Sequence, residues 1–354
     1  MMRTPDESQI TDVWERFLNI SDIGLDDDFF EIGGDSLVAA QIFAELEKRL
    51  ARPLPLSLIL EAPTVGTLAQ KLADVASPSQ QSCVVSLADG SSESPLFLLH
   101  PVGANLLHYR DLVRRLPPNQ SVYGLQPVGL DGAEDPIDDL RAMATRYLTE
   151  IRRAGFGPPY VLAGSSMGGT VAFEMGCRLR AEGESNVSVW LFDTWGPGYI
   201  RYSDSALVCQ FHKQVNRVRS HCINFFGRSG VDKLTYIKQV SRNVIDKFCC
   251  AIGVTDPTPI SASIRSVWRA NNHAITHFQL GSYDGEVVLF RASWQPSGAN
   301  NDETLGWRPL VHGELVIREV SGYHGECCLE PHVASLAEAV NAELRRLSSE
   351  PVGA

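Results

Sequence analysis

The chain has 354 residues, of which 44% are apolar and 21% are charged, and its formal net charge is −11. At about 150 residues per domain this length predicts two domains, and the composition excludes a disordered chain. The acidic charge argues against a nucleic-acid-binding function. No run approaches the ~20 apolar residues of a membrane helix and the first residues have no apolar signal core, so we expect a cytoplasmic protein.

The eight cysteines include two adjacent pairs, Cys249-Cys250 and Cys327-Cys328, but no Cys-x-x-Cys motif. Neither a zinc site nor a disulfide framework is therefore predicted, and we expect no metal.

Charge and composition change near residue 80. Residues 1–80 hold 14 acidic and 6 basic residues, a net of −8, whereas the remaining residues hold 28 acidic and 25 basic residues, a net of −3. Around this change in charge, residues 75–94 are mostly small and polar. We therefore expect an N-terminal domain at 1–76, a linker at 77–82 and a larger domain at 83–349.

Helical spacing of apolar residues predicts a four-helix bundle in the N-terminal domain. The first helix carries Ile10, Val13, Trp14, Phe17 and Leu18. A second follows Asp35, a short apolar stretch covers residues 56–60, and Thr64 caps a last helix.

The most informative stretch of this domain is Asp-Phe-Phe-Glu-Ile-Gly-Gly-Asp-Ser-Leu at residues 28–37. Two glycines permit a sharp turn, and Ser36 falls at a helix start, where unpaired N–H groups would face an attached phosphate. An ordinary N-cap serine is the alternative. The whole string resembles the phosphopantetheine attachment motif of carrier proteins, in the form typical of the peptidyl carriers of nonribosomal peptide synthetases, although hybrid synthases also use it. The resemblance implies 4′-phosphopantetheine on Ser36, a phosphopantetheinyl transferase that attaches it, and upstream synthase modules as partners.

From residue 95 onward, continuous apolar runs alternate with helical patterns. The runs are residues 96–99, 122–125, 160–163 and 187–192. Such strands predict an α/β domain with a parallel sheet covered on both faces.

Gly-Ser-Ser-Met-Gly at residues 164–168 stands between a predicted strand and a predicted helix. This is the context of the Gly-x-Ser-x-Gly nucleophile elbow. Only Ser166 has glycines two residues before and after it, so we predict Ser166, rather than Ser165, as the nucleophile. A passive serine in a glycine-rich turn is the alternative.

A serine nucleophile needs a base and an orienting acid, which follow it in the order acid, then histidine, in this type of domain. Asp193 ends the next strand, and Asp302 is the second candidate for the acid. His324 follows the strand 315–320 through a Gly322-Tyr323 turn and is the predicted base. His332 is expected to be a cap or a surface contact, and His312 precedes the strand.

Backbone N–H groups should stabilise the oxyanion. One is expected from Met167, the residue after the nucleophile. The other is expected from the loop after the first strand, at Val102, although a plain strand-to-helix loop is the alternative.

Residues 83–349 resemble the thioesterase domain that ends many nonribosomal peptide and polyketide synthases, which has the α/β-hydrolase fold. The resemblance favours Asp193 as the acid and implies a helical lid insertion at about 194–280. The family's loop often has a double glycine where this chain has Gly103-Ala104. Residues 201–250 hold nine basic and three acidic residues, which predicts a lid surface that attracts the acidic carrier.

The sequence thus predicts a serine thioesterase that accepts an acyl or peptidyl chain from Ser36 and releases it by hydrolysis or intramolecular cyclisation. The alternatives are a stand-alone esterase or lipase, a Claisen-type carbon–carbon-forming cyclase, a carrier-linked acyl transferase to an external nucleophile, and a carrier with an inactive hydrolase domain.

Overall fold

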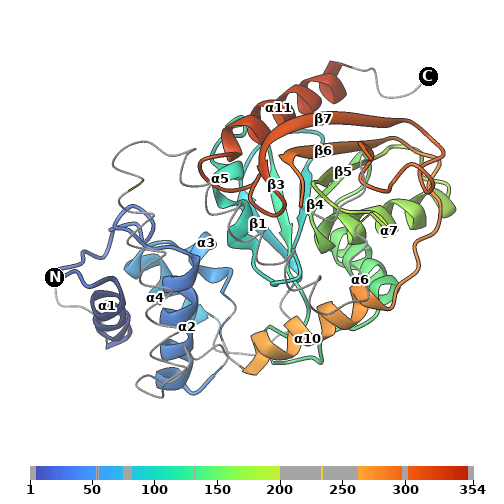
Figure 1. Ribbon diagram of the computed structural model, residues 1–354. Helices are drawn as coiled ribbons and strands as arrows, with labels where there is room; N and C mark the ends of the chain where they lie inside the picture. Colours follow the sequence, from blue (N-terminus) through green and yellow to red (C-terminus); the bar gives the residue numbers. More distant parts are fainter. Residues whose placement is uncertain are drawn as a thin grey trace, which may run out of the picture.

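A helical N-terminal region lies beside one edge of an α/β region that is built on a seven-stranded sheet (Figure 1). The computed structural model describes residues 5–52, 54, 56–74, 82–130, 132–199, 233, 262–296 and 302–349. None of the helices in these ranges combines the length and the apolar character that crossing a bilayer would need. The predicted linker at 77–82 falls outside the described residues except for Ser82.

The N-terminal region contains the four predicted helices. They are α1 (Pro5–Leu18), α2 (Ser36–Leu50), α3 (Leu58–Glu61) and α4 (Val65–Asp74). Phe29, from the loop before α2, is completely buried among them. Its ring lies 5.1 Å from that of Trp14 and 5.0 Å from that of Phe30, in edge-to-face contacts that add to the burial of apolar surface.

The loop between Phe29 and α2 is tightly folded. Gly33 has a φ of +101°, and a Cβ on Gly34 would lie 2.4 Å from the carbonyl oxygen of Phe29. The carboxylate of Asp35 accepts a hydrogen bond of 2.8 Å from the N–H of Val38, so Asp35 is the N-cap and Ser36 is the first residue of α2.

The sheet has the strand order β1-β3-β2-β4-β5-β6-β7. Its strands are β1 (Val84–Ala88), β2 (Leu96–Leu99), β3 (Val122–Leu125), β4 (Tyr160–Ser165), β5 (Val187–Phe192), β6 (Val287–Trp294) and β7 (Leu315–Tyr323). The strands β2 to β7 pair in parallel, as predicted.

The sheet has one edge strand that the sequence analysis did not predict, β1, which pairs with β3 in the antiparallel direction. Only residues 89–95 join β1 to β2. A crossover between parallel strands needs about a dozen residues or more, so this short connection reverses the chain direction.

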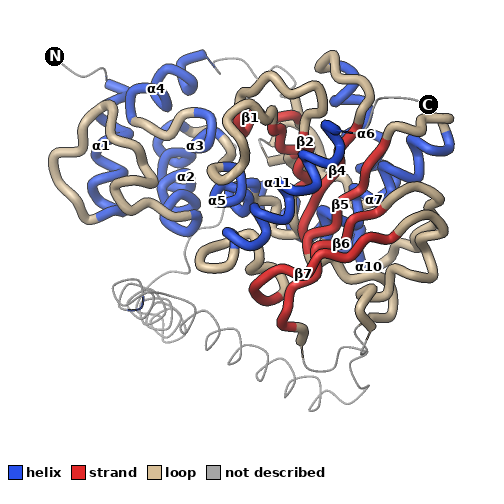
Figure 2. Tube along the Cα trace, turned by 90° about the horizontal axis from the view of Figure 1, so that it is seen from above, coloured by secondary structure: helices blue, strands red, loops and turns tan. Residues whose placement is uncertain are grey.

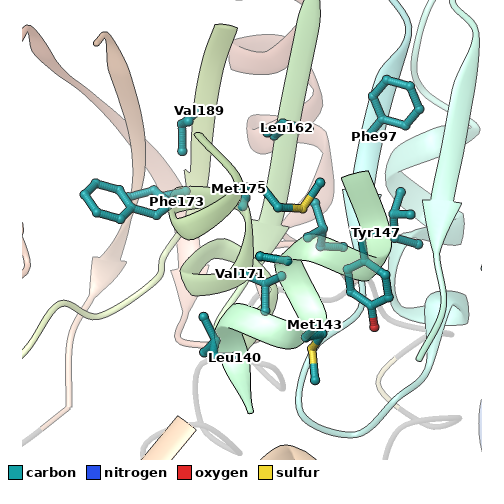
Figure 3. Close-up of a cluster of buried hydrophobic side chains, with 14 of the residues drawn as sticks. Phe97, Leu140, Met143, Tyr147, Leu162, Val171, Phe173, Met175 and Val189 are labelled. Carbon is teal, nitrogen blue, oxygen red and sulfur yellow. The ribbon is translucent and has the colours of Figure 1, made fainter. Parts of the chain in front are cut away.

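Helices cover both faces of the sheet (Figure 2). The helices α6 (Leu140–Arg153) and α7 (Met167–Ala181) pack on one face, against alternate residues such as Phe97 and Leu162 (Figure 3). The opposite face, which includes Leu98 and Val161, is covered by η1 (Leu106–Tyr109), α5 (Arg110–Val113) and α11 (Val333–Ser349). This two-sided burial explains why the central strands are apolar without interruption.

Two details differ from or extend the sequence prediction. β7 continues through Gly322 and Tyr323 instead of turning there, so His324 follows the strand directly. Of the predicted lid at 194–280, the structure describes residues 194–199, 233 and 262–280, with α10 (Ala262–Thr276) as its helix. The predicted basic surface at 201–250 lies outside the described residues apart from Lys233.

Replacing Gly34 with alanine should unfold the loop that leads into α2, because the new Cβ meets a backbone carbonyl that cannot rotate away. We expect Gly34→Ala to speed hydrogen exchange throughout α1 to α4 and to leave exchange in the α/β region unchanged. Gly24→Ala is the matched control, since the nearest atom there belongs to the exposed end of the Asp27 side chain, at 3.2 Å, and not to the backbone. Equal exchange in the two variants would contradict this account of the loop.

Candidate active site

Ser166 lies in a strained turn between β4 and α7. Its φ of +54° and ψ of −123° are unusual for a residue with a side chain. The turn is possible only with glycines around it: a Cβ on Gly164 would lie 2.3 Å from the backbone of Gly168, and one on Gly168 would lie 2.2 Å from the carbonyl oxygen of Leu99. These are the glycines of the predicted nucleophile elbow, so the motif has the geometry that the sequence predicted.

The two serines of the elbow differ in accessibility. Ser165 is the last residue of β4 and is 1% exposed, whereas Ser166 is only partly buried. A nucleophile must reach its substrate, and this difference favours Ser166.

Asp193 and His324 are in direct contact. The Nδ1 of His324 lies 2.9 Å from the Oδ2 of Asp193, whose side chain is completely buried. Asp193 follows β5, the strand next to β4, and its φ of +44° lets the chain turn sharply there. The carboxyl ends of adjacent parallel strands therefore bring this pair to the edge of the sheet at which Ser166 emerges.

The second candidate acid, Asp302, is engaged elsewhere. Its carboxylate accepts hydrogen bonds from the N–H and hydroxyl of Thr304 and from the N–H of Gly306. Burial raises the pKa of Asp302, but these hydrogen bonds outweigh it and lower the pKa below its usual range. Asp302 thus caps a turn, and it is Asp193 that orients His324.

The other two histidines that were considered differ from His324 in their surroundings. His332 is 6% exposed and its Nδ1 lies 3.0 Å from the hydroxyl of Ser321, so it is buried rather than a surface contact. His312 is exposed before β7.

Two residues that the sequence analysis did not identify hold the Asp193–His324 pair. The side-chain amide of Gln295 donates to the Oδ1 of Asp193 at 2.7 Å, and the N–H of Ala292 donates to the same oxygen at 2.8 Å. Trp195 stacks on the ring of His324 with centroids 3.5 Å apart. Trp195 stands two residues after Asp193, whereas nothing in the sequence marks Gln295.

The loop that should supply the second oxyanion donor is a tight turn. The N–H of Ala104 donates to the carbonyl of Pro101 at 2.8 Å, which places Val102 and Gly103 at the tip. Ala104 has a φ of +61°, a conformation that favours glycine, and this explains why a double glycine suits the same loop. From α10, the buried amide of Asn271 donates to the carbonyl of Val102 at 3.1 Å.

His100 fixes the peptide between Pro101 and Val102. Its Nδ1 lies 3.0 Å from the carbonyl oxygen of Pro101, and its Nε2 lies 2.6 Å from the hydroxyl of Tyr147. Burial lowers the pKa of His100 to about 4, so the ring is neutral at pH 7. A carbonyl only accepts, so Nδ1 carries the proton and the tyrosine hydroxyl donates to Nε2. The N–H of Val102 belongs to the peptide that this chain of hydrogen bonds orients.

Tyr109 connects the loop to the elbow. Its buried hydroxyl donates to the carbonyl of Leu99 at 2.6 Å and accepts from the N–H of Ser165 at 2.9 Å. The end of β2 and the residue before Ser166 are thus held by one side chain.

Each of the two regions matches a known protein family. A family model described as the thioesterase domain matches residues 94–344. The chain belongs to this thioesterase family. A second model, described as the phosphopantetheine attachment site, matches residues 8–72. The two matches confirm the predicted pairing of a carrier with a thioesterase.

Proteins of similar sequence include a synthase and a synthetase. The dimodular nonribosomal peptide synthase of Bacillus subtilis (strain 168) is 25% identical over 346 residues, which cover 98% of this chain and 14% of that protein. Malpibaldin synthetase of Mortierella alpina is 28% identical over 353 residues, which cover 96% of this chain and 6% of that protein. The chain therefore spans only a small part of the length of these relatives.

Solved structures share the fold. A holo four-domain nonribosomal peptide synthetase matches 99% of this chain with a TM-score of 0.59 and 24% identity, over 26% of its own length. The NocB thioesterase domain from the nocardicin cluster matches 74% of this chain and 98% of its own with a TM-score of 0.51 and 22% identity.

The start of α2 suits an attached phosphopantetheine. The helix has 15 residues and begins at Ser36, so a phosphodiester on this residue would lie at the positive end of the helix dipole, next to the cap that Asp35 forms.

Replacing Asp193 with asparagine should slow thioester hydrolysis severely, because the amide disturbs the tautomer of His324 that Asp193 selects. Asp302→Asn is the matched control and should keep most of the activity. The rates of both variants are measured with a soluble thioester. A severe loss in Asp302→Asn with activity retained in Asp193→Asn would show that the acid is misassigned.

The free energy of unfolding should fall at acidic pH because His100 is neutral in the folded protein. The unfolded chain takes up a proton near the ordinary pKa of 6.5, whereas folded His100 does so only near pH 4, so stability is lost as the pH falls below 6.5. Between pH 7 and 5 the wild type should lose about 2 kcal/mol more unfolding free energy than the non-titrating variant His100→Gln. Urea denaturation at both pH values measures this difference, and parallel pH profiles would refute it.

Proposed function

We propose that this chain releases an acyl or peptidyl chain from a synthase, by transfer from the carrier at Ser36 to Ser166 followed by hydrolysis or intramolecular cyclisation. The observation that carries the proposal is the 2.9 Å contact between His324 and Asp193 at the sheet edge where the elbow presents Ser166. In this proposal residues 1–76 are the carrier, 77–82 the linker and 83–349 the thioesterase, with a lid at about 194–280.

Phosphopantetheine on Ser36 supplies the thiol on which the chain arrives as a thioester. The carrier contributes the attachment point at the start of α2, and the rest of the chemistry belongs to the thioesterase.

The first half-reaction forms an ester on Ser166. Its hydroxyl oxygen attacks the thioester carbonyl while the Nε2 of His324, the nitrogen that does not face Asp193, takes the proton. The buried carboxylate of Asp193 stabilises the imidazolium that results. His324 then returns the proton to the leaving thiol.

The oxyanion of this step is stabilised by N–H groups at two positions. Met167 is the first residue of α7, so its N–H has no acceptor within the helix and faces the turn at Ser166. Val102 supplies the second N–H from the loop that His100 and Asn271 hold.

The second half-reaction breaks the ester. His324 takes a proton from water, which gives an acid, or from a hydroxyl or amine of the bound chain itself, which gives a ring. In both cases Ser166 recovers its proton from His324.

Two related reactions use the same residues. A Claisen-type cyclase would let a carbon nucleophile of the bound chain attack the ester, and an acyl transferase would admit an external nucleophile. The attached carrier argues against a stand-alone esterase or lipase, which has no use for Ser36. Partners in the proposed role are a phosphopantetheinyl transferase and upstream synthase modules, in the cytoplasm.

Removing the nucleophile should trap the chain on the carrier. Ser166→Ala deletes one oxygen at a strained turn, so the fold should persist while release falls by orders of magnitude. Intact-protein mass spectrometry after loading with an acyl-coenzyme A and a broad phosphopantetheinyl transferase should show the acyl group retained. Release at the wild-type rate in Ser166→Ala would contradict the proposal.

A variant at Ser36 tests where phosphopantetheine is attached. Ser36→Ala should gain no phosphopantetheine mass under the same conditions. A mass gain in this variant would place the attachment elsewhere.

A further inference from the structure

The carrier and the thioesterase meet at a specific interface, formed by α3 and the loop before α2 on one side and by η1, α5 and β1 on the other. Leu107, from η1, is 6% exposed and packs into the hydrophobic core of the carrier. The hydroxyl of Ser57 donates to the side-chain oxygen of Gln126 at 2.6 Å, and both residues are buried. One apolar and one polar contact therefore fix where the carrier sits.

The central contact of this interface pairs an arginine with an aromatic ring. The guanidinium of Arg110, at the start of α5, lies 3.9 Å from the centre of the Phe30 ring. Its side chain is 22% exposed, so the cation is partly desolvated, which strengthens its attraction to the ring. Burial and the neighbouring Arg114 lower the pKa of Arg110, while Asp28 on the carrier acts in the opposite direction.

On the carrier, this contact belongs to the attachment loop. Phe30 stands six residues before Ser36 and touches Phe29, against which Gly34 is folded. The position of Phe30 is thereby linked to the start of α2.

On the thioesterase, the contact belongs to the segment that follows the oxyanion loop. Arg110 directly follows Tyr109, whose hydroxyl joins β2 to the N–H of Ser165. The segment Asn105–Arg114 thus touches the attachment loop at one side and supports the elbow at the other.

A pocket of about 240 Å³ opens between the two domains, lined by Asp28, Phe30 and Leu60 of the carrier and by Leu106, Arg110 and Val113 of the thioesterase. The Arg110–Phe30 contact therefore lies at a groove that solvent reaches.

We infer that the segment Asn105–Arg114 is the docking surface on which the thioesterase receives its own loaded carrier, with Arg110 holding Phe30 beside the attachment loop. The inference rests on the proposed function, since it takes discharge of Ser36 as the event that docking serves.

Single-turnover discharge of the full-length chain tests this inference. Ser36 is loaded with an acyl group, and its loss is followed by intact-protein mass spectrometry. Arg110→Ala should slow discharge about threefold to thirtyfold, as expected for the loss of a partly desolvated cation–π contact. Phe30→Leu, which keeps an apolar side chain but removes the ring, should slow it similarly, and combining the two should add little.

Two controls separate docking from chemistry. Hydrolysis of a soluble acyl-N-acetylcysteamine by the same variants should be unchanged, because this substrate needs no carrier. Arg16→Ala removes an arginine from another ring, that of Phe17 at 5.5 Å, outside the interface, and should discharge like the wild type.

Other outcomes would overturn the inference. One is discharge by Arg110→Ala at the wild-type rate. Another is faster discharge, because the contact would then hold the carrier away from Ser166. Equal slowing with both substrates would also overturn it, by assigning the effect to the elbow. A wild type that processes neither substrate would instead refute the proposed function.

Discussion

The side chain of Asp193 is completely buried, and three hydrogen bonds hold its carboxylate at the end of β5. Burying a carboxylate is costly unless it is hydrogen-bonded, and the N–H of Ala292 and the amide of Gln295 offset that cost. They leave one oxygen for His324, whose ring is also fixed by Trp195. Because these hydrogen bonds and the stacked Trp195 fix the imidazole in one orientation, its Nε2 points away from Asp193.

The other half of the site depends on close backbone approach. Glycines let β4, α7 and β2 converge on Ser166, and Tyr109 ties the end of β2 to the elbow. His100 extends this rigid framework to the loop with Val102. The proposed docking segment begins at the same loop, so in our proposal delivery of the chain and its cleavage depend on one continuous stretch of backbone between β2 and α5.

The sequence was sufficient where the chemistry is local. The elbow needs glycines at fixed spacing around Ser166. Asp193 and His324 were predicted from their places after strands and from the family resemblance, and the structure brings their side chains into contact; their catalytic roles stay a prediction. The sequence was insufficient where contacts join distant segments, as with Gln295, Asn271 and the pairing of Arg110 with Phe30. The strand β1 was not predicted, because its short apolar run stands among small polar residues. The basic surface predicted for residues 201–250 stays a prediction, since those residues are not described apart from Lys233, and the interface that the structure describes includes α5.

The central claim is that His324, oriented by Asp193, activates Ser166. Labelling with an organic fluorophosphonate, followed by peptide mass spectrometry, tests it most directly, because such reagents react only with an activated serine. The account predicts a single adduct on Ser166, with labelling abolished in His324→Ala and retained in His332→Ala. An adduct on Ser165, or labelling of Ser166 that persists at the same rate without His324, would contradict it.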